Sequence, residues 1–451
     1  MKKRFRLSTS HIIMLSFLSA ILLGSLLLSL PISSASGKAV SYLDALFTAT
    51  TSTCVTGLVV APTFSTWSLF GQLVILVLIQ IGGLGVLTVL TGFTLAFHRR
   101  MGLGDHLLMQ DAFNLSSLSD LKRFILRVIA GTFAVEGVGA LLYMTVFVPQ
   151  FGARGVYLSI FTSISAFCNA GIDVLGEVSL CDYATNPVIN LVTMALIVLG
   201  GIGYIVWWDV VRVIRQTKGL KTRRFSRLTL HSKIALTSTL ILILVGALCF
   251  FVLEYNNPQT MKDASFLDRL QLSFFQSVTV RTAGFATLPQ EAFTNASSVI
   301  SLLLMFIGGS PVGTAGGVKT VTVTVLLLAA ISEVRSKEEV SIFHRSLSRQ
   351  AVSKAIAVVM TSFAIVFLST VALAAVTDRP LLDVLYETVS ATGTVGLSRN
   401  LTPHLNAAGK WILIAAMYLG RVGPISLAVA FRLRRRSVNA IKNPAETISV
   451  G

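Results

Sequence analysis

The chain has 451 residues, of which 53% are hydrophobic and 13% are charged. A soluble domain carries about 25% charged residues, so this composition excludes a soluble enzyme. The formal net charge is +17, from 37 Lys and Arg against 20 Asp and Glu. Such an excess suggests nucleic-acid binding in a soluble protein. In a membrane protein it reflects topology, and we expect no nucleic-acid partner.

Eight apolar runs predict eight membrane spans. They lie at about residues 11–31, 67–97, 124–148, 187–211, 233–253, 297–332, 353–377 and 410–431. Each is long enough for the ~30 Å hydrocarbon core of a bilayer. The first run follows the basic start MKKRFR and could be read as a signal peptide. Its length and the absence of a convincing cleavage site favour a retained span.

Four shorter segments alternate with these spans, and each ends in a loop that contains one glycine. The glycines are Gly57, Gly171, Gly284 and Gly396, separated by 114, 113 and 112 residues. This steady period indicates a fourfold internal repeat. A second glycine motif follows each loop, at 81–85, 199–203, 307–310 and 419–423. The predicted fold is an all-α membrane protein in which four units of helix, re-entrant half-helix with loop, and helix surround a central pore.

The predicted units have defined boundaries and a predicted orientation. The repeats cover residues 11–98, 124–211, 231–334 and 351–432, between an N-terminal segment, 1–10, and a tail, 433–451. Of the 37 Lys and Arg, 27 fall in the segments on the face that bears both termini. The positive-inside rule makes that face cytoplasmic, so we expect a multi-pass protein of the cell membrane whose glycine loops enter from outside.

The glycine loops are expected to face one another. Non-helical backbone inside a bilayer is tolerated only where protein or water surrounds it. Glycine lets a carbonyl turn toward a central axis through φ and ψ values that are costly for other residues. Rings of carbonyls that replace an ion's hydration shell form K⁺ channel filters. For any single loop a helix C-cap is the alternative reading, but four copies at one period favour a filter.

These features resemble the Trk/Ktr/HKT superfamily of potassium transporters, and most of all the Ktr membrane subunit. The resemblance rests on the four repeats, the single-glycine loops, the glycine-interrupted sixth span and an arginine in the last span, over residues 11 to about 432. It implies K⁺ uptake, with Na⁺ dependence left open. Some plant members have Ser in the first loop and prefer Na⁺, whereas Gly57 indicates a K⁺ preference. The K⁺-facing carbonyls would come from Val55, Thr56, Gly57, Asn169, Ala170, Gly171, Thr282, Ala283, Gly284, Thr394, Val395 and Gly396.

The resemblance also implies partners. It suggests a homodimer in membrane lipid, seated on a cytosolic ring of RCK-type regulatory subunits that bind nucleotides. The chain has no GxGxxG or GxxxxGKS motif. We therefore expect no nucleotide site in this chain, and the cytoplasmic segments 99–123, 212–233 and 335–354 are candidate contacts with the ring.

The sixth span carries a candidate gate. The sequence IGGSPVGTAGGVKT, residues 307–320, contains five glycines and Pro311, which disfavour a continuous helix. Close helix packing through small residues is the alternative. The family resemblance makes this segment a mobile intramembrane gate beneath the filter. The candidate gate residues are Gly308, Gly309, Ser310, Gly313, Gly316, Gly317 and Arg421.

Charged residues inside the spans are costly and need partners. Arg421 either snorkels or, as favoured here, lies just below the filter and repels K⁺. Arg281 is expected to brace the third loop through carbonyls or an acidic neighbour such as Glu387. Lys319 either snorkels or pairs with a carbonyl of the glycine-rich segment. Glu136 is a packing group about as often as a functional one.

Two other functions compete with K⁺ uptake. One is a Na⁺-selective or weakly selective monovalent cation transporter. The other is an intramembrane enzyme, which the absence of a GxSxG motif and of intramembrane Asp or His pairs argues against. We therefore expect no enzyme activity and no catalytic residues. The scattered histidines and cysteines predict no metal site apart from K⁺ at the filter.

Overall fold

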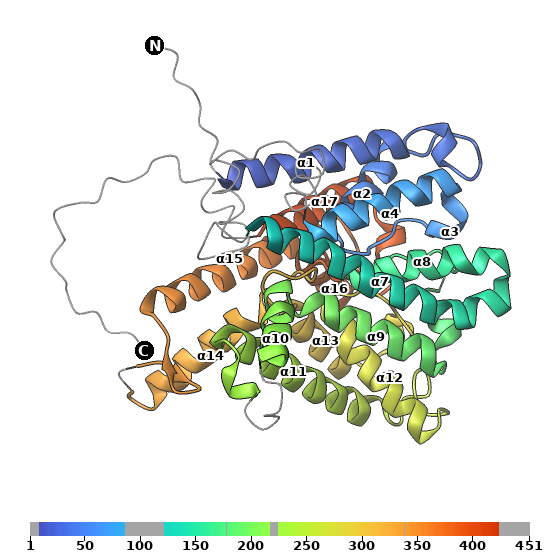
Figure 1. Cartoon of the computed structure of the whole chain (residues 1–451). Helices are drawn as coiled ribbons and strands as arrows, with labels where there is room; N and C mark the ends of the chain where they lie inside the picture. The colour runs from blue at the N-terminus through green and yellow to red at the C-terminus, as the bar shows by residue number, and fades with distance from the viewer. Residues whose placement is uncertain (1–8, 86–120, 177, 217–223, 338, 424–451) are drawn as a thin grey trace, which may run out of the picture.

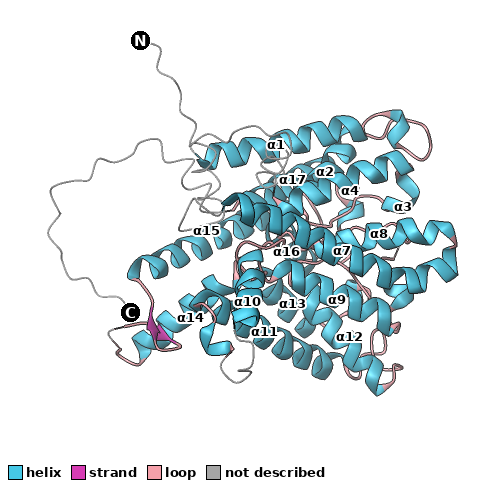
Figure 2. Ribbon diagram, in the orientation of Figure 1, coloured by secondary structure: helices cyan, strands magenta, loops and turns pink. Residues whose placement is uncertain are grey.

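The computed structural model describes residues 9–85, 121–176, 178–216, 224–337 and 339–423. In these ranges the regular secondary structure is helical, apart from one short antiparallel hairpin of β1 (Ser341–Ile342) and β2 (Arg345–Ser346), and loops join the elements (Figure 2). Several predictions lie outside the described residues. These are most of the N-terminal segment, the ends of the second and eighth spans, most of the basic segment 99–123, part of the basic segment 212–233, and the tail.

Four helices are long and apolar enough to cross a membrane, judged by length and composition. They are α1 (Thr9–Leu28), α7 (Leu121–Phe151), α11 (Leu230–Glu254) and α15 (Arg349–Ala374). Only 17 to 33% of their most apolar windows is buried. Because apolar side chains cover so much of their exposed surface, these helices are suited to lipid, and the protein is a multi-pass membrane protein.

Each long helix is followed by a short and deeply buried helix. The short helices are α2 (Tyr42–Cys54), α8 (Ala153–Phe167), α12 (Phe266–Thr279) and α16 (Leu381–Gly393). At 1.5 Å per residue, 13 to 15 residues extend about 20 Å, which is too little to cross the bilayer. In α2, every residue from Ala45 to Cys54 is buried. The C-terminal ends of these short helices place the four predicted glycine loops.

A third helix follows each short one. These are α4 (Leu69–Leu84), α9 (Pro187–Gly201), α13 (Asn295–Phe306) and α17 (Ala407–Val422). Each begins after a polar cap whose side chain accepts a backbone N–H of the first turn. The capping residues are Ser68, Asn186, Thr294 and Asn406. The connections before them contain α3 (Thr63–Thr66) and the 3₁₀ turns η2 (Cys181–Tyr183), η5 (Gln290–Ala292) and η6 (Thr402–His404), and a further 3₁₀ turn, η1 (Pro31–Ser33), joins α1 to α2.

Two of these third helices are interrupted. The sixth apolar run stops at the end of α13 and resumes as α14 (Thr320–Val334), so the break expected at 307–320 is present. The residues between the two helices, 307–319, are called the break loop below. The segment predicted as a span at 187–211 is bent, because α9 and α10 (Tyr204–Gln216) meet at an angle of 96°. After α10, η4 (Phe225–Arg227) precedes α11.

The break loop accounts for the bend between α9 and α10. Gly203, at the corner, has φ +95°, and a Cβ added there would lie 2.4 Å from the carbonyl oxygen of Pro311. The next backbone N–H, of Tyr204, donates to the carbonyl of Val312 at 2.9 Å. The chain therefore turns away at the place where the break loop packs, and α10 leaves the direction of α9.

The four units pack in a closed ring. Each long helix contacts the short helix that follows it. The third helix of each unit contacts the short helix of the next unit: α4 packs on α8, α9 on α12, α13 on α16, and α17 returns to α2. Figure 1 shows α17 beside α2 and α4, although more than 300 residues separate them in the sequence. The C-terminal ends of all four short helices consequently face a common centre.

Candidate functional site

The four glycine loops, residues 55–57, 169–171, 282–284 and 394–396, share one unusual backbone conformation. The first residue of each lies in the left-handed region: Val55 (φ 55°), Asn169 (φ 60°), Thr282 (φ 68°) and Thr394 (φ 51°). The third, the glycine, also has positive φ, of 101°, 63°, 82° and 96° in chain order. Left-handed backbone costs a residue with a Cβ about 1–2 kcal/mol, and three of the four first residues are β-branched. The same strained turn is therefore built four times.

The glycines meet the carbonyls of the neighbouring loops in a ring. A Cβ added to Gly57 would lie 2.4 Å from the oxygen of Ala170, one on Gly171 2.6 Å from Ala283, one on Gly284 2.7 Å from Val395, and one on Gly396 2.2 Å from Thr56. The loops thus follow one another in chain order around one axis. No residue with a side chain fits at any of the four glycines unless the ring opens.

Hydroxyl groups of the short helices hold these turns, a role that was not predicted from the sequence. Thr51 Oγ1 accepts the N–H of Gly57 at 3.0 Å, and Ser390 Oγ accepts that of Gly396 at 3.0 Å. In the second and third loops a hydroxyl instead donates to the carbonyl after the glycine, Ser165 to Ile172 and Thr279 to Phe285. The signal was the abundance of Ser and Thr before each glycine. The ring therefore contains two kinds of loop.

A cavity of about 400 Å³, called the mouth below, opens on one side of the ring. All four glycines line it, together with residues that follow them in each unit, including the acidic Asp173 and Glu291. Burial raises the pKa of the Asp173 carboxyl to about 6, although the N–H of Leu175 donates to it at 3.2 Å. The mouth can therefore attract cations while this group is ionised.

The break loop lies directly against three of the glycine loops, on the side of the residues that precede the glycines. The Thr314 hydroxyl lies 3.1 Å from the carbonyl of Phe167 and 3.2 Å from Asn169 Oδ1, in the second loop. The N–H of Gly316 donates to Thr282 Oγ1 of the third loop at 3.1 Å. A Cβ on Gly316 would lie 1.9 Å from Thr394 Oγ1 of the fourth. This segment therefore lies across the side of the ring opposite the mouth.

The other predicted gate residues fold the break loop back on itself and onto α9. The N–H of Gly308 donates to Val318 at 3.0 Å, and Gly317 has φ +64°. The N–H of Ser310 donates to the carbonyl of Gly201 at 2.8 Å. A Cβ added to Gly309 would lie 2.8 Å from the same Gly201 oxygen. A Cβ added to Gly313 would lie 2.8 Å from the carbonyl oxygen of Gly200. Glycine is needed because these backbones approach so closely.

Arg421 joins three elements beneath the ring. From α17, its Nη1 donates to the carbonyl of Thr314 in the break loop at 2.7 Å, and its Nη2 donates to Gly82 in α4 at 2.5 Å. In the described part of the chain it forms no ion pair with a carboxylate. The sequence predicted a cation at this depth. It did not identify Thr314 as the partner, since that contact joins residues 107 positions apart.

Three other charged residues predicted inside the spans contact polar groups of the protein. Lys319 Nζ donates to the carbonyl of Ala315 at 2.6 Å, so it pairs within the break loop. Arg281 Nη2 lies 3.5 Å from the carbonyl of Gly308. No ion pair joins it to Glu387 among the described residues, and the Glu387 carboxylate instead accepts the hydroxyls of Ser398 and Thr402. Glu136 accepts Gln80 Nε2 at 3.2 Å.

The helices and the buried ring of strained loops define a helical, multi-pass membrane protein with non-helical backbone at its centre. The model of the TrkH family, described as cation transport protein, matches residues 3–441, and the chain belongs to this family. The resemblance seen in the sequence is thereby confirmed.

Curated relatives cover nearly the whole chain. It is 39% identical to the Ktr system potassium uptake protein B of Bacillus subtilis (strain 168), over 96% of this chain and 95% of the relative. It is 36% identical to the protein of the same name from Vibrio alginolyticus, over 98% and 94%. It is 35% identical to the potassium/sodium uptake protein NtpJ of Enterococcus hirae, over 100% and 99%. These relatives are named as transport proteins.

A solved structure has the same fold. The crystal structure of the potassium transporter TrkH from Vibrio parahaemolyticus matches with a TM-score of 0.76 and 16% identity, over 96% of this chain and 86% of the other. At this identity the match concerns the fold alone.

Proposed function

We propose that this protein is the ion-translocating subunit of a Ktr-type potassium uptake system. The single observation that carries the proposal is the ring in which each glycine of a left-handed loop abuts a carbonyl of the next loop. The relatives named as Ktr system potassium uptake proteins support the choice of ion.

In this proposal K⁺ loses its hydration shell to backbone carbonyls of the four glycine loops. The left-handed residues and the glycines turn those carbonyls toward the axis, and the hydroxyls of the short helices hold them there. The mouth concentrates cations on the side from which K⁺ enters. Uptake follows the electrochemical gradient of K⁺, and coupling to Na⁺ is a separate question for the transport assay.

The break loop is the proposed gate. It lies against the ring through Thr314 and Gly316, and Arg421 fastens it to α4. A buried cation at this depth opposes the passage of another cation. Movement of the break loop and of Arg421 away from the axis would open the inner side of the pathway.

The architecture proposed around this site is four repeats and eight spans, with the boundaries given from the sequence and with both termini cytoplasmic. Four or five spans are recognised by length and composition among the described residues. The α4, α13–α14 and α17 segments supply the others in this proposal. A homodimer on a cytosolic RCK-type, nucleotide-binding ring is proposed from the Ktr relatives, whose names refer to a system.

Weakly selective K⁺ and Na⁺ transport is the second candidate function. The two kinds of glycine loop favour it, since chemically unequal loops form an approximate ring. The relative named potassium/sodium uptake protein supports it as well. Bi-ionic reversal potentials distinguish the candidates: very high K⁺ selectivity contradicts the second, and a small K⁺ to Na⁺ ratio supports it.

The test of the proposed function is growth of a K⁺-uptake-deficient bacterium on low K⁺. We expect the chain to restore growth, more strongly with a co-expressed Ktr ring subunit. Running each strain with and without Na⁺ measures the Na⁺ dependence. Failure to restore growth under all four conditions, with the protein present in the membrane, contradicts the proposal.

A further inference from the structure

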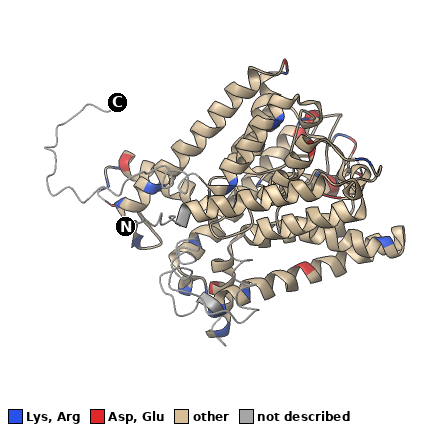
Figure 3. Cartoon of the chain, turned by 90° about the horizontal axis from the view of Figure 1, so that it is seen from above, with Lys and Arg blue, Asp and Glu red and all other residues tan. Residues whose placement is uncertain are grey.

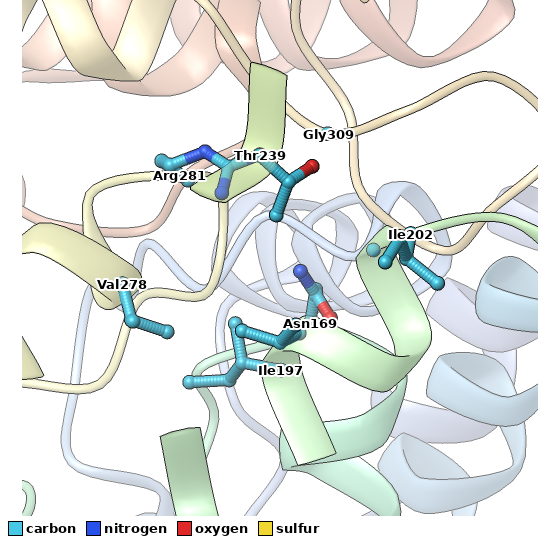
Figure 4. A pocket seen from close by; sticks show the side chains of 9 residues that line it. Asn169, Ile197, Ile202, Thr239, Val278, Arg281 and Gly309 are labelled. Atoms are coloured by element: carbon cyan, nitrogen blue, oxygen red, sulfur yellow. The ribbon is translucent and has the colours of Figure 1, made fainter. Parts of the chain in front are cut away.

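A small cavity lies beside the second and third glycine loops, behind the ring. It is lined by Asn169, Ile197, Val198, Gly201, Ile202, Thr239, Val278, Arg281 and Gly309. Figure 4 shows Arg281, Thr239 and Asn169 converging on one space from three different elements, with Val278 and Ile197 as apolar walls. The cavity has room for about one water-sized occupant.

Three residues that line this cavity each have a buried polar side-chain atom without a hydrogen-bond partner in the described part of the chain. These atoms are Asn169 Nδ2, Thr239 Oγ1 and Arg281 Nε. Their residues are 1%, 6% and 7% exposed. Leaving a single buried donor without a partner costs about 1–3 kcal/mol, and three around one cavity are unusual in a folded protein.

All three atoms can donate a hydrogen bond. The guanidinium N–H and the amide NH₂ can do nothing else, and a hydroxyl can donate as well. The Asn169 amide is oriented by its Oδ1, which lies 3.2 Å from the Thr314 hydroxyl, so its NH₂ faces the cavity. A convergence of donors around a guanidinium fits an anion and repels a cation.

The charge of Arg281 is also unmatched. Among the described residues its side chain forms no ion pair, and its one hydrogen bond there is the 3.5 Å contact to the carbonyl of Gly308. A buried guanidinium stays charged and is costly without a counter-charge. A counter-ion in the adjoining cavity would remove this cost.

We propose that the cavity binds one small monovalent anion, of the size of chloride, between Arg281, Asn169 and Thr239. The space excludes polyatomic anions such as phosphate. Its consequence for transport rests on the proposed function. Arg281 precedes Thr282 of the third glycine loop, so a bound anion neutralises a positive charge beside the ring and raises K⁺ occupancy there.

The direct test replaces chloride by bromide, which is located by its anomalous scattering in crystals of the full chain. We expect a bromide peak within hydrogen-bonding distance of Arg281 Nε and Asn169 Nδ2. Arg281→Gln should abolish the peak. Because Arg281 is buried beside the ring, a milder second variant, Thr239→Val, keeps the test independent of folding: loss of one donor should raise the bromide concentration for half occupancy about tenfold. A water peak without anomalous signal at saturating bromide overturns the proposal.

Thr237→Val is the matched control on the same helix. The Thr237 hydroxyl donates to the carbonyl of Lys233 at 2.7 Å in its own helix and does not line the cavity. Its bromide occupancy should equal that of the unchanged protein. An equal loss in both Thr variants would show that the helix, and not the donor, holds the ion, and would overturn the assigned site.

The consequence for transport is measured as K⁺ flux into proteoliposomes in chloride and in gluconate at equal ionic strength. We expect lower flux in gluconate, restored by bromide, and a need for about tenfold more chloride in Thr239→Val. If bromide binds at the site but K⁺ flux is the same in all anions, the link between the anion site and K⁺ movement is overturned. Absence of K⁺ flux in every anion contradicts the proposed function, while the scattering experiment still decides the anion site.

Discussion

The first residue of each glycine loop stores strain at the centre of the molecule. Val55 and Thr394 have φ, ψ of 55°, 52° and 51°, 58°, which β-branched side chains seldom adopt. Such strain persists where the surroundings determine the backbone completely. Here the backbone is fixed by burial and by the hydroxyls of Thr51 and Ser390, which accept backbone N–H groups of the first and fourth loops. The strain is therefore tied to the position of the carbonyls.

Gly57→Ala should disable the ring. The added Cβ would lie 2.4 Å from the oxygen of Ala170, in a residue with φ +101°, so the first two loops must separate. We expect K⁺ uptake to fall about tenfold or more, since displacement of a binding site by about 1 Å has effects of this size. Gly37→Ala is the control: its φ is +70°, but nothing lies within 4 Å of the added Cβ. Equal uptake by both variants would contradict the close approach of the loops.

Arg421→Ala should increase K⁺ flux. It removes the buried positive charge and the hydrogen bonds that join the break loop to α4, at Thr314 and Gly82. Rates of K⁺ uptake or leak at equal protein level measure the effect. Lys410→Ala is the control on the same helix, because Lys410 pairs with Asp44 at 2.5 Å, at the other end of α17. An unchanged K⁺ flux in Arg421→Ala would contradict a role of Arg421 in the gate.

Asp173 should make uptake depend on pH at the mouth. Its pKa is raised by burial to about 6, so the carboxyl is ionised at pH 7 and neutral well below pH 6. We expect K⁺ uptake to fall as the pH on the mouth side drops through about 6, because the negative charge is lost. Asp173→Asn should remove this step and show the lower rate already at pH 7. Asp182→Asn, which does not line the mouth, should retain the step.

Among the elements, the break loop could be predicted from the sequence, and the bend between α9 and α10 could not. Five glycines and Pro311 disfavour a continuous helix from their own properties. The bend depends on the backbone of another unit, since Tyr204 donates to Val312 and Gly203 abuts Pro311. The Ser and Thr anchors were visible only as composition. A hydroxyl's partner depends on the turn that follows it, which the sequence does not specify.

The segment after the fourth glycine loop is fastened by Arg399. This side chain pairs with Asp383 at 2.8 Å and donates to the carbonyl of Gln290 at 3.0 Å and to Ser298 Oγ at 2.8 Å. It thus ties α16 and its loop to the third unit. The α16 carboxylate of Glu387 holds the same segment through Ser398.

Arg399→Gln should destabilise the fold. The arginine side chain is 11% exposed. Its loss removes the charged partner of Asp383 and donors to Gln290 and Ser298, which should lower the free energy of unfolding by about 1–3 kcal/mol. Thermal unfolding in detergent measures the loss as a lower melting temperature. Arg379→Gln changes an exposed arginine near the same helix and should have almost no effect. Equal melting temperatures of the two variants would show that Arg399 does not fasten the loop.

At the scale of the whole molecule, the regular glycine spacing indicated four units, but not how they close. Closure requires α17 to pack on α2 across most of the chain length, a contact that no local pattern specifies. The net charge of +17 was interpreted as a sign of membrane topology, and Figure 3 shows several acidic residues gathered at one end of the helices. This arrangement agrees with an acidic mouth and with the proposed cytoplasmic termini.

The central claim is that the four glycine loops bind the transported ion. Rubidium, which substitutes for K⁺ and scatters anomalously, tests it most directly in crystals of the full chain. We expect an anomalous peak on the axis of the ring, bounded by the carbonyls of the four loops, which include those of Thr56, Ala170, Ala283 and Val395. The peak should be lost when Rb⁺ is replaced by a large organic cation. Rubidium bound elsewhere, with no peak between the loops, would contradict it.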